Sequence, residues 1–160
     1  MRAADTPSGS LLPNAGNGRD LPNASQSAGN EQFESREPSK SPEFVQQYIG
    51  GKLAFWQQRL KLSDWKLSWT FADPGDLKPN TVGQIHWDKP SKTASILVLS
   101  PSGYHMPFQA MLDDMEFTII HELVHLELTS LPHSEASRGS EEQAVNGIAG
   151  ALFALEHPTR

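Results

Sequence analysis

Apolar residues recur with a helical period in three segments of the chain. The pattern predicts helices over residues 42–62, 108–128 and 141–155. Ser41 and Pro42 provide the N-cap and first turn of the first helix. The glycine pair that begins at Gly50 is expected to bend or interrupt its middle. Ser140 is the predicted N-cap of the last helix, because two acidic residues follow it directly.

A shorter, period-two alternation lies between the first two helices and predicts strands. The expected strands cover residues 65–71, 82–87 and 93–99. In the first of them, aromatic and aliphatic residues alternate with polar ones, which is typical of a strand with one buried face. The turn-forming residues 88–91 join the last two strands, so we predict one antiparallel meander. All four Trp residues fall at core-facing positions and are expected to pack there.

The order of elements and the chain length define the expected architecture. With 160 residues, of which 37% are hydrophobic, the chain has material for one domain. Residues 41–160 are therefore predicted to form an α+β domain, with a small, mostly antiparallel three-stranded sheet packed on the helix of residues 108–128. Ser, Pro, Gly and Asn fill 18 of the first 40 positions, so residues 1–40 are expected to be a disordered polar tail.

Charge and residue usage narrow the classes of partner and cofactor. The formal net charge of −6 argues against a basic surface that would bind nucleic acid. The sequence contains no Cys, so a bound metal would have to be held by His and carboxylate groups. No apolar run reaches membrane-spanning length, and the N-terminus lacks the apolar stretch of a signal peptide. These features predict a cytoplasmic protein that binds neither nucleic acid nor membrane.

The chemically informative segment reads His121-Glu122-Leu123-Val124-His125 and lies in the second predicted helix. Residues four apart on a helix lie about 40° apart around its axis and roughly 6 Å apart along it. His121 and His125 can therefore direct imidazole nitrogens at one metal ion, and we expect Zn²⁺. Glu122 lies about 100° from His121, where it can act as the base for a water at the metal.

Apolar residues cover most of the remaining surface of this helix, which indicates that the helix is buried. Two imidazoles and a carboxylate in its middle then need partners, because unpaired buried polar groups are costly. The alternative is that His121 and His125 hydrogen-bond to the backbone. About one shuffled chain in seventy of this composition would contain the motif by chance, and the apolar setting favours the metal.

A catalytic zinc site needs a third protein ligand, and three residues further along the chain are candidates. Glu142 is favoured because it shares a helical face with Asn146, which can orient a ligating imidazole. Glu141 is an alternative, although it aligns with apolar positions. His133 is the other alternative, and a surface position is its default interpretation. Structural or solvated roles are expected for the remaining histidines: His86, His105 and His157.

The His121-Glu122-x-x-His125 motif followed by Glu142 and Asn146 resembles the gluzincin metallopeptidases. It is most similar to small members found in phages and other mobile elements, and the similarity extends over most of the predicted domain. The resemblance implies a zincin-like fold in which Glu122 is the general base and Asn146 is the hydrogen-bond partner of His121. It also implies the set of zinc ligands: His121, His125 and Glu142.

These observations predict zinc-dependent hydrolysis of peptide bonds in a peptide or protein substrate. Glu122 would take a proton from the attacking water and pass it to the leaving amine. An edge strand, at residues 95–99, is expected to align an extended substrate by main-chain hydrogen bonds. The alternative function is a non-catalytic protein-binding module in which zinc only stabilises the fold and residues 1–40 form the interaction arm.

Overall fold

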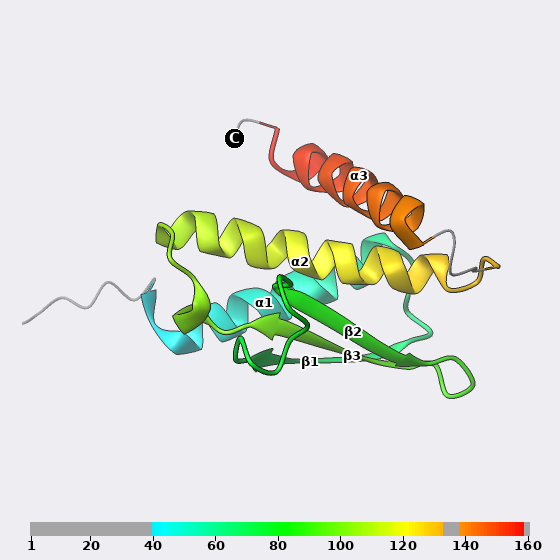
Figure 1. Cartoon of the computed structure of the whole chain (residues 1–160), viewed down its shortest axis with the longest axis horizontal. Coiled ribbons are helices and arrows are strands. Elements are labelled where there is room, and N and C mark those ends of the chain that lie inside the picture. The colour runs from blue at the N-terminus through cyan, green and yellow to red at the C-terminus, as the bar shows by residue number, and fades with distance from the viewer. Residues whose placement is uncertain (1–39, 133–137, 159–160) are drawn as a thin grey trace, which may run out of the picture. The chain divides into compact units, whose positions relative to one another are not determined.

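A computed structural model describes residues 40–132 and 138–158 of this chain. Within these residues the chain forms three α-helices and three strands, with a short 3-10 turn after the last strand (Figure 1). The elements are α1 (Pro42–Arg59), β1 (Lys66–Ala72), β2 (Gly83–Asp88), β3 (Thr93–Leu99), η2 (Pro101–Gly103), α2 (Phe108–Leu128) and α3 (Arg138–Glu156). The predicted α+β class is therefore confirmed. The predicted tail of residues 1–40 lies, except for Lys40, outside the described residues.

The first helix begins as its sequence predicts and continues past its glycine pair. The Ser41 hydroxyl accepts a hydrogen bond from the backbone N–H of Phe44 at 3.1 Å, which caps the first turn of α1. The indole of Trp69 lies against the helix at Gly50, where an added Cβ would be 3.7 Å from Nε1. Tertiary packing thus keeps α1 regular where glycine alone would weaken it.

The last helix starts earlier than expected. Because α3 already begins at Arg138, Ser140 lies inside the helix and its predicted role as N-cap is wrong. Helix ends are fixed by local turns that hydrophobic periodicity does not report, and the predicted start at residue 141 is three residues too late.

The sheet is mixed, and the predicted antiparallel meander is wrong. Its strand order is β1-β3-β2, with β3 parallel to β1 and antiparallel to β2. The turn between β2 and β3 forms the expected hairpin, but the long loop of residues 73–82 carries β2 past the end of β3. β3 is the most apolar of the three strands, which suits a central position with neighbours on both edges.

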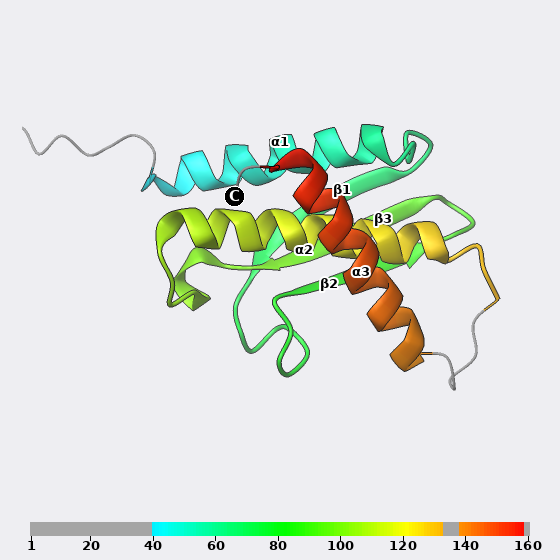
Figure 2. The ribbon, with the colours of Figure 1, turned by 90° about the horizontal axis from the view of Figure 1, so that it is seen from above.

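Helices cover one face of this sheet. Figures 1 and 2 show the sheet, then α1 and α2 lying side by side, and then α3 crossing α2 on the side away from the strands. Fully or almost fully buried apolar residues from these elements form one core, including Ile49, Trp56, Ile96, Val98, Met115, Ile119, Leu123 and Val145. Trp87 departs from the prediction that every Trp packs in the core, because it is 42% exposed. The central helix α2 is thus buried between the sheet and α3.

Candidate metal centre

Helix α2 brings the two motif histidines together. His121 and His125 lie one turn apart, and their Nε2 atoms are 3.1 Å from each other. Their side chains are 18% and 13% exposed, so both rings are mostly covered but retain a route to solvent. The helix is apolar on its other faces, and the strand and helix packing described above fixes its rotation. The motif therefore presents two imidazole nitrogens at one point.

Helix α3 adds a carboxylate to this pair. Glu142 lies near the start of α3, with Oε1 at 3.2 Å from His125 Nε2 and Oε2 at 3.6 Å from His121 Nε2. Val145 and Ala149 are fully buried, so the Glu142 end of the helix is packed against α2. Ligand atoms of His121, His125 and Glu142 all lie within 4.8 Å of one another. These three residues form a group that can hold a metal ion.

The spacing of the three ligand atoms fits a metal of a particular size and geometry. Two ligands about 2.0–2.1 Å from a tetrahedral ion are about 3.3 Å apart. The two Nε2 atoms are 3.1 Å apart, and the Glu142 oxygens approach them at 3.2 Å (Oε1 to His125) and 3.6 Å (Oε2 to His121), all close to this value. The Glu142 side chain is 55% exposed, so the group is open toward solvent beside it.

Each imidazole has a further polar neighbour from α3. A side-chain hydrogen bond joins Asn146 to His121. Glu141 lies on the other side of His125, with Oε1 at 3.6 Å from Nδ1. Such contacts orient a ligating ring from behind. The carboxylates of Glu141 and Glu142 thus flank opposite nitrogens of one histidine, and Glu142 also approaches His121.

Burial controls the protonation of His121. Desolvation lowers the pKa of His121, and the neighbouring His125 lowers it further. Glu142 and the hydrogen bond between His121 and Asn146 act in the opposite direction without reversing the shift. The neutral imidazole is therefore favoured, and this is the form that binds a metal.

Glu122 is buried beside the group, under the start of β2. The residue is 6% exposed, and a Cβ placed on Gly83 would come within 3.0 Å of its Oε1 and 2.2 Å of Thr118 Cγ2. Only glycine fits at that point of the strand. Desolvation and the charge of Glu142 raise the pKa of Glu122 to about 7, with Lys78 opposing the shift. A carboxyl group titrating near neutrality can accept and return a proton.

Of the other histidines considered from the sequence, those within the described residues are not part of this group. His133 lies outside the described residues, so the structure does not test it as a ligand. His86 lies exposed on β2, in contact with Gln84, and His157 contacts Glu116 at 3.1 Å. Among the described residues, the candidate ligands are therefore confined to α2 and α3.

Sequence reasoning missed one fully buried charge on α2. Glu116 has no exposed surface and is bonded to side chains from α1 and to His157. A signal was present, because Glu116 lies between the apolar residues Met115 and Phe117. An acid at such a position must find donors in the folded protein.

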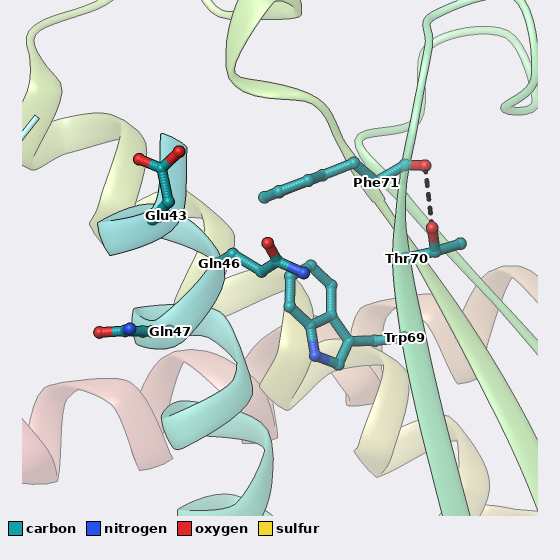
Figure 3. A pocket seen from close by; sticks show the side chains of 6 residues that line it. All are labelled: Glu43, Gln46, Gln47, Trp69, Thr70 and Phe71. Carbon is teal, nitrogen blue, oxygen red and sulfur yellow. Dashed lines mark hydrogen bonds between the residues drawn. The ribbon is translucent and has the colours of Figure 1, made fainter. Parts of the chain in front are cut away.

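A separate groove of about 650 Å³ lies between α1 and β1 (Figure 3). Its walls are polar on the helix side, from Gln46 and Gln47, and largely aromatic on the strand side, from Trp69 and Phe71. Since β1 and β2 are opposite edges of the sheet, this groove is remote from the strand end that covers Glu122. The groove therefore does not belong to the candidate metal centre.

Comparisons with models of protein families, with curated proteins and with solved structures find no match for this chain. None of the helices within residues 40–132 and 138–158 is both long and apolar enough to cross a membrane. The function of the candidate site therefore has to be inferred from its own residues and their geometry.

Proposed function

We propose that this protein is a zinc-dependent peptidase of minimal gluzincin type, with a zincin-like domain. The observation that carries the proposal is the convergence of His121 Nε2, His125 Nε2 and the Glu142 carboxylate. The two Nε2 atoms are 3.1 Å apart, Glu142 Oε1 lies 3.2 Å from His125 Nε2 and Oε2 lies 3.6 Å from His121 Nε2. When both imidazoles present an unprotonated Nε2, these groups are all acceptors, and a cation between them offsets their mutual repulsion. Two imidazoles and one carboxylate with an open side are the ligand set of catalytic zinc sites.

The residues have separate roles in the proposed reaction. When bound, the zinc ion would supply Lewis-acid polarisation of the scissile carbonyl and a lowered pKa for water. Glu122, buried next to His121, accepts the proton of the attacking water and transfers it to the leaving amine. Asn146 and Glu141 hold the two imidazole rings in place from α3.

The substrate strand is proposed to pair with β2. The prediction that residues 95–99 form an edge strand is wrong, because β3 lies between β1 and β2. β2 is the edge strand next to the site, since Gly83 at its start lies directly over Thr118 and Glu122. An extended peptide added to the outer edge of β2 would pass close to the proposed base.

Replacing Glu122 by Gln tests this proposal. Peptide cleavage, followed by mass spectrometry on a peptide library, should fall by about 10²–10⁴-fold because the base is lost. Zinc content should be unchanged, since Glu122 is not a ligand. Glu127→Gln is the matched control, because Glu127 is an exposed acid on the same helix. Full activity of the Glu122→Gln variant, or a zinc-loaded parent protein that cleaves no peptide, would contradict the proposal.

Chelation separates the enzyme from the alternative of a binding module with structural zinc. Most of the main core comes from α1, α2 and the sheet, and α3 adds only Val145 and Ala149 as buried residues. Removing zinc should therefore lower the melting temperature only modestly. Loss of the whole cooperative unfolding transition on chelation would favour the structural role instead.

A further inference from the structure

A second polar cluster lies on α2, five residues before His121. Glu116 is completely buried, and its Oε1 accepts a hydrogen bond from Trp56 Nε1 at 2.9 Å. Its Oε2 accepts from Tyr48 Oη at 2.9 Å and is paired with Lys52 Nζ at 2.9 Å. His157 Nε2 approaches the same oxygen at 3.1 Å. We call these five residues the Glu116 cluster.

The cluster joins all three helices at one carboxylate. Tyr48, Lys52 and Trp56 come from successive turns of α1, whereas His157 follows directly after α3. Since the carboxylate accepts, His157 must carry a proton on Nε2 in this contact. The contacts of Glu116 with α1 and with His157 use separate donors. Removing a donor from α1 leaves the contact with His157 in place, and removing His157 leaves the contacts with α1 in place.

Helix α3 is attached to the core through a narrow strip of its surface near its middle. Its fully buried residues are Val145 and Ala149, and at Gly147 and Gly150 an added Cβ would meet nothing within 4 Å. Glycines in an open helix interior lower helix stability by about 1 kcal/mol each relative to Ala. The direction of such a helix depends strongly on how its ends are held.

The two ends of α3 carry different contacts with α2. Glu142 lies near the first end, within reach of His121 and His125, and His157 binds Glu116 beyond the second. A ring contact between Phe153 and Phe117, with centroids 6.4 Å apart, lies on the same interface. Fifteen residues separate Glu142 from His157, which is about 22 Å along a helix. A small tilt at the second end therefore displaces Glu142 at the first.

We propose that Glu116 and His157 are positioning residues for the metal centre. Their contact fixes the direction of α3 on α2, and so holds the Glu142 carboxylate at the nitrogens of His121 and His125. This inference rests on the proposed metal binding, but not on peptide hydrolysis.

Zinc affinity of two matched variants of the full chain tests the proposal. His157→Ala and Tyr48→Phe each remove one hydrogen-bond donor from Glu116 Oε2, but only the first releases α3. Zinc affinity, measured by competition with a chromophoric chelator, should fall about tenfold or more in His157→Ala, as for other groups that orient ligands. It should stay within about twofold of the parent in Tyr48→Phe. His157→Gln, which restores an N–H donor, should recover part of the loss.

A second measurement covers the case in which a variant is too unstable for titration. Amide hydrogen exchange of the zinc-free protein should become faster along α3 in His157→Ala, with α1 unchanged, and faster along α1 in Tyr48→Phe. Equal zinc affinity in the parent protein and His157→Ala, or equal losses in His157→Ala and Tyr48→Phe, would overturn the proposal. A parent protein that binds no zinc would overturn both this inference and the proposed function. Zinc binding without cleavage would overturn catalysis alone.

Discussion

The Glu116 cluster and the metal group are centred on the same helix, five residues apart, and have opposite balances of hydrogen-bond donors and acceptors. Glu116 is one acceptor surrounded by donors from α1 and by His157. The metal group contains acceptors from His121, His125 and Glu142, gathered within 4.8 Å. The first arrangement is electrostatically complete within the protein, whereas the second is completed by a cation. Complementarity of charge, more than burial, thus distinguishes a structural polar cluster from a binding site.

The two regions also differ in the exposed fraction of their carboxylate side chains. The Glu116 side chain has no exposed surface, whereas the Glu142 side chain is 55% exposed. A ligand for a catalytic metal needs an open side for substrate, and a structural carboxylate is best desolvated among its donors. The following changes test that contrast, beginning with the largest effect.

Replacing Glu116 by Ala should destabilise the fold most. The substitution leaves the Lys52 ammonium and the Trp56 N–H without their acceptor, and breaking a buried pair in this way costs about 3–5 kcal/mol. Urea unfolding of the zinc-free protein measures the loss in free energy of unfolding. Glu127→Ala, at an exposed site of the same helix, should change it by less than about 0.5 kcal/mol. Similar losses in both variants would contradict a structural role for the cluster.

Replacing Glu142 by Ala should act on zinc binding and hardly on folding. We expect zinc affinity to fall more than about 100-fold, since even groups behind a ligand contribute 10–100-fold. Glu141→Ala should cost about tenfold or less, because Glu141 approaches Nδ1 of His125, on the side of the ring away from the other ligands. Competition titration with a chromophoric chelator measures both. A greater loss in Glu141→Ala than in Glu142→Ala would reassign the third ligand.

Lowering the pH should reduce the stabilisation by the Glu116 cluster by less than the Glu116→Ala substitution does, because a protonated carboxyl group keeps its acceptor oxygens. Burial alone would raise the pKa of Glu116, but hydrogen bonds from Lys52, Trp56 and Tyr48 outweigh it and the pKa lies below its usual 4.5. The stabilisation is therefore complete above pH 4.5 and is lost as the pH falls through the lowered pKa. The difference in free energy of unfolding between the parent and Glu116→Gln should shrink over that range. A difference independent of pH would exclude the ionised carboxylate as its source.

The periodicity of apolar residues along the sequence located most helices and strands of this fold. The strand predicted over residues 93–99 and the helix predicted over residues 108–128 have the same limits in the structure, because side-chain periodicity reports backbone geometry directly. Strand order was not predictable in the same way. The hairpin between β2 and β3 is local, but the parallel pairing of β1 with β3 depends on contacts across the loop of residues 73–82.

The sequence by itself determined the pairing of His121 with His125, since a single helical turn separates them. It favoured Glu142 over Glu141 by helical face, but only the packing of α3 on α2 brings that carboxylate to within 3.2 Å of His125. The tertiary structure alone decided the surroundings of Glu116 and the place of β2 over Glu122. The physical reason is range: backbone periodicity extends over a few residues, whereas these contacts join segments tens of residues apart whose approach depends on the whole core.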